Sequence, residues 1–115
     1  MDVICELMKL KPENVKDYID LHNNTWPELV KELRKAGFEE LYIYILDNLV
    51  MVIMKCEDFK SSMVKAENSV AFMKWDAIVR EWLISDEHFF HTQDVLLDLE
   101  PIWRLDSFDK DGFLK

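Results

Sequence analysis

Glycine, proline and cysteine are scarce in this chain of 115 residues, and basic residues are outnumbered by acidic ones. With only two glycines and three prolines, long flexible or proline-rich linkers are not expected, and the length predicts a single domain. The 14 lysines and arginines stand against 23 aspartates and glutamates, which gives a net charge of −9. Polyphosphate is repelled by this balance, so the composition argues against nucleic acid as a partner.

The sequence also lacks the patterns typical of a membrane span or an export signal. No window reaches the ~18 apolar residues that a membrane helix needs, so no membrane partner is expected. The first residues lack a basic segment, and Glu6 and Lys9 interrupt their apolar run. We therefore expect no signal peptide and a cytoplasmic location. Cys5 and Cys56 stand in apolar runs, which favours small buried side chains over a disulfide or a reactive thiol.

Hydrophobic residues make up half of the chain, which is enough for a packed core. Their spacing alternates between strand and helix patterns. Val3–Leu10 is the first predicted strand, and Val15–His22 repeats at helical spacing after Pro12. Leu41–Leu46 and Leu49–Lys55 predict a hairpin, because the Asp-Asn pair between them suits a two-residue turn.

A second helix is predicted between the first helix and the hairpin. Thr25 and Glu28 have the spacing of a capping box, so this helix is expected to begin at Thr25, with Pro27 in its first turn. Gly37 is suited to its C-terminal cap. The predicted buried face comprises Trp26, Leu29, Leu33 and Ala36.

Two more helices and a strand are predicted after the hairpin. Asp58–Ala66 and Asn68–Leu83 have helical patterns, and Asn68 is placed to cap the second of them. A polar loop, Ser85–Asp94, then leads to a last strand at Val95–Leu105.

This order of elements predicts an α+β fold, a ferredoxin-like antiparallel sheet with helices on one face, over residues 1–105. Residues 106–115 form a C-terminal tail. The hairpin arms are apolar at almost every position, as strands are when both faces are covered. Helices would cover one face of the sheet. An enclosed cavity or a second copy of the chain would cover the other face, and pairing with a second copy predicts a homodimer. The pocket between sheet and helices is the default site.

The end of the first predicted helix gathers polar and aromatic residues. Tyr18 and His22 are four residues apart and share one face of the helix. On spacing alone, such a histidine is more often a hydrogen-bonded core residue. Asn23, Asn24 and Trp26 follow closely, and this composition is typical of carbohydrate pockets, where rings cover the sugar and polar groups bond its hydroxyls.

Other patterns favour structure over chemistry. One aromatic stripe at helical spacing is typical of core, with a ligand platform as the alternative; it comprises Phe72, Trp75, Val79 and Trp82. His88 and His91 lack a third ligand at suitable spacing, so no metal site is expected there. Asp109–Gly112 is similar to part of a calcium loop but lacks the distal glutamate.

Residues 18–29 carry the pattern Y-x-x-x-H-x-x-x-W-P-E, which resembles the opening helix of the rhamnose/fucose mutarotase family. The likeness spans nearly the whole chain and continues at Gly37, Ile43-Tyr44, the hairpin from Asn48, Lys74-Trp75 and Leu99–Trp103. The resemblance implies a small dimeric α/β barrel that interconverts the α and β anomers of a 6-deoxyhexose without cofactor or metal. It places proton transfer on His22. It places contacts to the sugar on Tyr18 and Trp75. Trp26, Tyr44 and Lys74 are predicted as further sugar-binding residues.

Three positions depart from the family's pattern. Leu41 stands where rhamnose-type members have a tyrosine, and Lys74 replaces the first of their two adjacent tryptophans. Leu96 stands where the fucose-type branch has a tryptophan. The choice between rhamnose and fucose therefore stays open. Two other functions stay open with it: a non-catalytic sugar-binding or regulatory module, and a monooxygenase of the related barrel type that uses haem or a quinol.

Overall fold

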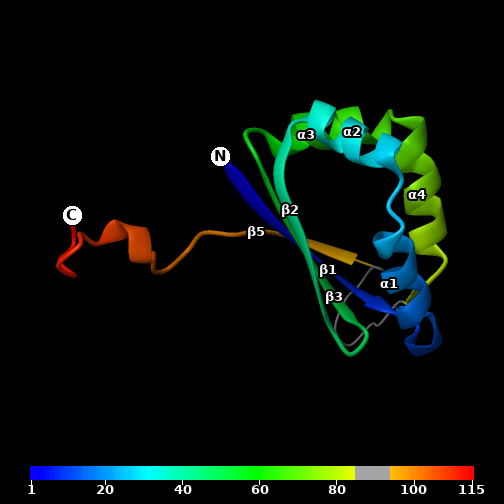
Figure 1. Ribbon diagram of the computed structural model, residues 1–115, viewed down its shortest axis with the longest axis horizontal. Coiled ribbons are helices and arrows are strands. Elements are labelled where there is room, and N and C mark those ends of the chain that lie inside the picture. Colours follow the sequence, from blue (N-terminus) through cyan, green and yellow to red (C-terminus); the bar gives the residue numbers. More distant parts are fainter. Residues whose placement is uncertain (85–93) are drawn as a thin grey trace.

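The computed structural model describes residues 1–84 and 94–115. In these residues, an antiparallel sheet of five strands is covered on one face by four α-helices (Figure 1). Helices and strands follow one another in the predicted order, and the predicted α+β, ferredoxin-like fold is confirmed. The polar loop predicted at Ser85–Asp94 lies outside the described residues except for Asp94.

Strand β1 (Asp2–Leu10) occupies the centre of the sheet. It pairs along one edge with β3 (Leu49–Cys56), and β3 pairs in turn with β2 (Phe38–Leu46). The other edge of β1 is shared by two strands. Its last residues pair with β4 (Leu83–Ile84), and its middle pairs with β5 (Asp94–Asp98). All of these pairs are antiparallel.

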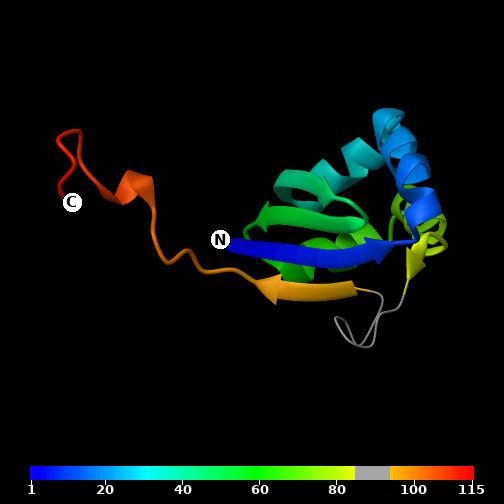
Figure 2. The ribbon, with the colours of Figure 1, turned by 90° about the horizontal axis from the view of Figure 1, so that it is seen from below.

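The helices form a single layer over the sheet, as Figures 1 and 2 show. Their bounds are α1 Val15–Asn23, α2 Pro27–Ala36, α3 Phe59–Glu67 and α4 Val70–Arg80, with short 3₁₀ turns at Pro12–Asn14 and Leu105–Ser107. None of the described helices is both long enough and apolar enough to cross a membrane.

The turn between β2 and β3 is the predicted Asp-Asn turn. Leu46 pairs with Leu49 across it, and Asp47 has a φ of 54°, a left-handed value that aspartate tolerates better than most residues. Gly37 also has the predicted role. With a φ of 107° it caps α2, and its N–H donates to the carbonyls of Leu33 and Arg34.

The predicted capping box at Thr25 and Glu28 is wrong. Helix α2 begins at Pro27, and the preceding residue, Trp26, makes no side-chain cap hydrogen bond. Pro27 favours this start because its fixed φ suits the first helical position. The Thr25 hydroxyl instead donates to the carbonyl of His22 at the end of α1, so it serves the previous helix.

The predicted bounds of α4 and of the last strand are also wrong. The Ser69 hydroxyl, not Asn68, caps α4 by accepting from the N–H of Phe72 at 3.3 Å. The helix ends at Arg80, which frees Leu83 to pair with β1. Strand β5 ends at Asp98 instead of continuing to residue 105, because β1 begins only two residues beyond the partner of Asp98.

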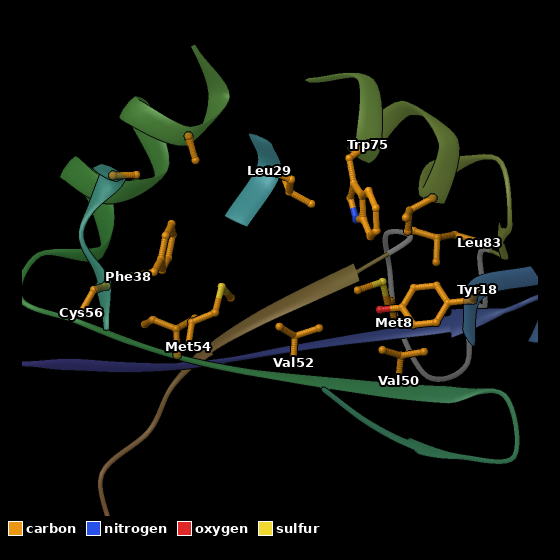
Figure 3. Packing of buried hydrophobic residues seen from close by; sticks show 14 of the residues in the cluster. Met8, Tyr18, Leu29, Phe38, Val50, Val52, Met54, Cys56, Trp75 and Leu83 are labelled. Carbon is orange, nitrogen blue, oxygen red and sulfur yellow. The ribbon is translucent and has the colours of Figure 1, made fainter. Parts of the chain in front are cut away.

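The core lies between the helices and the residues of β1 and β3 that face them (Figure 3). Alternate residues of β3 are buried, and Leu10, Val50 and Cys56 are fully enclosed. Cys5 and Cys56 are both buried and free, which confirms the prediction of small buried side chains, and Cys56 belongs to the core.

Among the described residues, no helix lies over the opposite face of the sheet (Figure 1). Tyr42, Tyr44 and Leu46 of β2 are exposed, at 48%, 58% and 70% of their surface. We call the side of the sheet that carries these residues the outer face. One chain alone therefore covers only one of the two faces that the apolar hairpin arms present.

After β5 the chain leaves the sheet and runs away from the rest of the molecule (Figures 1 and 2). Contacts within the tail order it locally. Phe108 forms a β-bridge with Leu114, and the rings of Trp103 and Phe108 lie 5.6 Å apart. Asp109 caps a tight turn by accepting from the N–H groups of Asp111 and Phe113, so the segment similar to a calcium loop is a hydrogen-bonded turn.

Candidate functional site

A pocket of about 530 Å³ lies between the helix layer and the sheet. Its floor is the face of the sheet opposite the outer face, and all four α-helices contribute side chains to its walls. The lining includes Glu6 and Met8 of β1, Tyr18 and His22 of α1, and Trp75, Asp76 and Arg80 of α4. Cavities of this size are typical of small-molecule sites.

His22 reaches the pocket from the last turn of α1. Its Nδ1 lies 2.7 Å from the carbonyl oxygen of Tyr18. A carbonyl can only accept, so this hydrogen bond places the proton of the neutral ring on Nδ1 and leaves the Nε2 lone pair available. Burial lowers the pKa of His22, and the hydrogen bond to Tyr18 opposes this only partly. The imidazole is therefore neutral at neutral pH and ready to accept a proton.

Aromatic rings hold the imidazole in place. The ring of Tyr18 lies 4.1 Å from that of His22, and the ring of Trp75 meets it edge-on at 5.0 Å. Trp26 packs edge-on against Trp75 at 5.1 Å. It does not line the pocket, so it supports Trp75 from behind. These contacts limit the orientations that His22 and Trp75 can adopt.

Tyr18 brings a phenol into the same corner. It is only 2% exposed, and burial together with the charge of Glu6 raises its pKa far above the ordinary value. The hydroxyl therefore stays protonated and can donate a hydrogen bond to a ligand oxygen.

A charged cluster borders this corner, and the sequence interpretation missed it. The Arg80 guanidinium lies 3.9 Å from the carboxylate of Glu6 and 3.4 Å from that of Asp76. Arg80 and Asp76 are one turn apart on α4, whereas Glu6 belongs to β1. Glu6 could have been noticed in the sequence, because it is a charged residue within an apolar strand. Ile4 and Met8, which flank it on the same face of β1, are buried.

The structure brings together three of the predicted site residues: Tyr18, His22 and Trp75 all line the pocket. Two others lie elsewhere. Tyr44 is on the outer face, because its neighbour Ile43 is the residue that points to the helices. Lys74 is exposed and does not line the pocket, although the adjacent Trp75 is buried.

The structure also locates two of the three positions that depart from the family's pattern. Leu41 lines the pocket, so an apolar side chain stands at the position of the family's tyrosine. Leu96 lies in β5, paired with Glu6. His88 and His91 fall outside the described residues. Within residues 1–84 and 94–115, no three His, Cys, Asp or Glu side chains gather as metal ligands would.

A family model and a known relative both relate the chain to L-rhamnose mutarotases. The family model described as L-rhamnose mutarotase matches residues 3–105. An L-rhamnose mutarotase of Burkholderia ambifaria is 29% identical over 84 residues, which cover 71% of this chain and 73% of the relative.

Solved structures support the fold. A crystal structure of an L-rhamnose mutarotase from Formosa agariphila has a TM-score of 0.65 at 21% identity, covering 90% of this chain and 98% of that one. A putative antibiotic biosynthesis monooxygenase from Nitrosomonas europaea matches at the same TM-score with 9% identity, covering 90% and 100%. At such identities the two structures show a shared fold and no more.

Proposed function

The chain belongs to the L-rhamnose mutarotase family, and we propose that it interconverts the α and β anomers of a 6-deoxyhexose of the L-rhamnose or L-fucose class in the pocket beside His22. The observation that carries the proposal is the state of His22. A neutral imidazole, oriented through Nδ1 and two aromatic rings, stands in a cavity large enough for a sugar.

The chemistry requires one proton to leave the anomeric hydroxyl and one to reach the ring oxygen. We infer that Nε2 of His22 takes the proton from the anomeric hydroxyl. The resulting imidazolium gives it to the ring oxygen as the bond between that oxygen and the anomeric carbon breaks. The open aldehyde rotates, and the reverse steps close the ring on its other face. No proton is gained or lost overall, and imidazole is suited to both transfers.

The remaining groups of the corner suit a neutral sugar. Tyr18 supplies a protonated hydroxyl, Trp75 an aromatic surface, and Glu6 and Asp76 acceptors for sugar hydroxyls. Among the described residues of this corner, the carboxylates of Glu6 and Asp76 outnumber the guanidinium of Arg80, so we expect a uronate or a sugar phosphate to be repelled. Leu41 offers no hydrogen bond to the substrate, so recognition of the hydroxyls falls to the groups near His22.

We also propose that two chains pair through the outer face. Tyr42, Tyr44 and Leu46 leave apolar surface exposed there, and a second copy would cover it. Sedimentation equilibrium tests this pairing. Tyr44→Asp is expected to raise the dimer dissociation constant at least tenfold. Val64→Asp, an equally exposed apolar position in the helix layer, is the control and is expected to leave it unchanged.

The function is tested by saturation-transfer NMR on the anomeric protons of L-rhamnose and L-fucose, with D-galacturonate as the anionic comparison. We expect exchange well above the buffer rate for at least one neutral sugar and little for the uronate. Sugar binding without faster exchange would replace the enzyme with a non-catalytic binding module. Neither binding nor exchange would reject the proposal.

A further inference from the structure

The pocket is longer than a single sugar ring requires. Its floor runs along β1 and β3, from Met8, which pairs with Val50, to Phe38, which pairs with Cys56. Val50 and Cys56 are six residues apart on β3, and at about 3.3 Å per residue the floor extends over roughly 20 Å. A pyranose, with one six-membered ring beside His22, would occupy only the part near Met8.

The two ends of the pocket differ in chemistry. Figure 3 shows Tyr18, Trp75 and Met8 together at one end, and Phe38 and Met54 below α3 at the other. The charged and hydrogen-bonding groups of Glu6, Arg80 and His22 belong to the first end. The second end, which we call the far compartment, is lined by Phe38, Leu41, Met54, Phe59 and Met63.

The described residues that line the far compartment offer few hydrogen-bonding groups to a sugar hydroxyl. The charged residue that α3 adds to the lining, Glu67, is exposed and so stands at the rim. A sugar hydroxyl placed deeper would lose its water partners without gaining others, which disfavours its binding there. An alkyl or aryl group would gain from burial there, and the unbranched side chains of Met54 and Met63 can adjust to its shape. The occupant is therefore apolar.

We propose that the far compartment binds an alkyl or aryl substituent carried by the sugar, so that the preferred substrate is a 6-deoxyhexose alkylated on the side of the ring away from its anomeric carbon. C4 lies across the pyranose ring from C1. With C1 beside His22, a group on the C4 oxygen would extend along the floor toward Phe38 (Figure 3) and toward Met63, which also lines the pocket. This inference rests on the proposed function, since it takes the anomeric carbon to lie at His22.

The test compares 4-O-benzyl-L-rhamnose with L-rhamnose, using anomer exchange for KM and isothermal titration calorimetry for binding. Burial of the benzyl group predicts a KM and a dissociation constant at least tenfold lower than for L-rhamnose, because burying an aromatic side chain contributes about that much. Met63→Phe narrows the far compartment and should remove the gain, and far-UV circular dichroism shows whether the variant is folded. Met73→Phe, the same change at an exposed position of α4 outside the pocket, should keep the gain.

Each result decides the proposal. Equal or weaker binding of the benzylated sugar, or a gain that survives Met63→Phe, would overturn it and leave the proposed mutarotase function intact. Tight binding of the benzylated sugar that is sensitive to Met63→Phe, without exchange of either sugar, would keep the far compartment and reject the catalytic function. Binding of neither sugar would overturn both.

Discussion

The two faces of the sheet are built from the same strands but end in different surroundings. On β3 the residues that face the helices, such as Val50 and Met54, are at most 6% exposed, whereas Tyr44 on the outer face is 58% exposed. The helix-covered face holds the core, the pocket and His22. The outer face also carries many apolar residues, and no helix of the described residues covers it. Because side chains alternate between the two faces along a strand, the same strands supply the face that forms the core and the pocket and the face that stays exposed.

The largest expected effect lies on the helix-covered face. His22→Ala removes the proposed proton-transfer group, and such groups contribute roughly 10²–10⁴-fold to a rate. Anomer exchange should fall by that factor toward the buffer rate. Asp20→Ala, on the exposed side of the same helix and outside the pocket, is the matched control and should stay within about twofold of wild type. Equal rates for His22→Ala and wild type would remove His22 from the mechanism.

The next largest difference between the two faces is expected in the free energy of unfolding. Leu10 is fully buried in β1, and Leu46 is 70% exposed in β2. Leu10→Ala leaves a cavity, so the free energy of unfolding should drop by about 2–5 kcal/mol. Leu46→Ala removes little buried surface and should change it by less than about 0.5 kcal/mol under conditions where the chain is monomeric. Urea denaturation measures both, and similar losses for the two variants would contradict the assignment of the faces.

The pH dependence should show a smaller effect. Burial lowers the pKa of His22 below the ordinary 6.5, so the reactive neutral form persists to lower pH than for an exposed histidine. The exchange rate should therefore persist to lower pH than for an exposed histidine and fall with a midpoint below 6.5. The unfolded chain takes up this proton first, so the stability due to neutral His22 is present above pH 6.5 and is lost as the pH falls below that value. A rate profile with its midpoint above 6.5 would contradict this order of pKa values.

Local features of the fold could be predicted from the sequence. The Asp47-Asn48 turn, the Gly37 cap and the pairing of Tyr18 with His22 each depend on residues within a few positions of one another. Where two local signals competed, the prediction failed. Pro27 set the start of α2, although Thr25 had the better capping pattern. The two-residue strand β4 is too short to show a period at all.

The candidate site was predictable only in part. His22 and Trp75 were identified through the resemblance, but the approach of Glu6 to Arg80 joins residues far apart in the sequence and depends on how α4 lies over β1. Tyr44 was misplaced for a different reason. When both faces of a strand are apolar, the pattern does not show which alternate residues face the helices. Only the pairing of Ile43 with Val52 in the folded sheet decides it.

The central claim is that the sugar binds on the helix-covered face beside His22. The tryptophan indole N–H signals of ¹⁵N-labelled protein test it most directly, because Trp75 lines the pocket and Trp103 lies exposed in the tail. Titration with L-rhamnose or L-fucose should move the Trp75 signal, and that of Trp26 behind it, and leave Trp103 in place. A shift of Trp103 with Trp75 unmoved at saturating sugar would contradict the account.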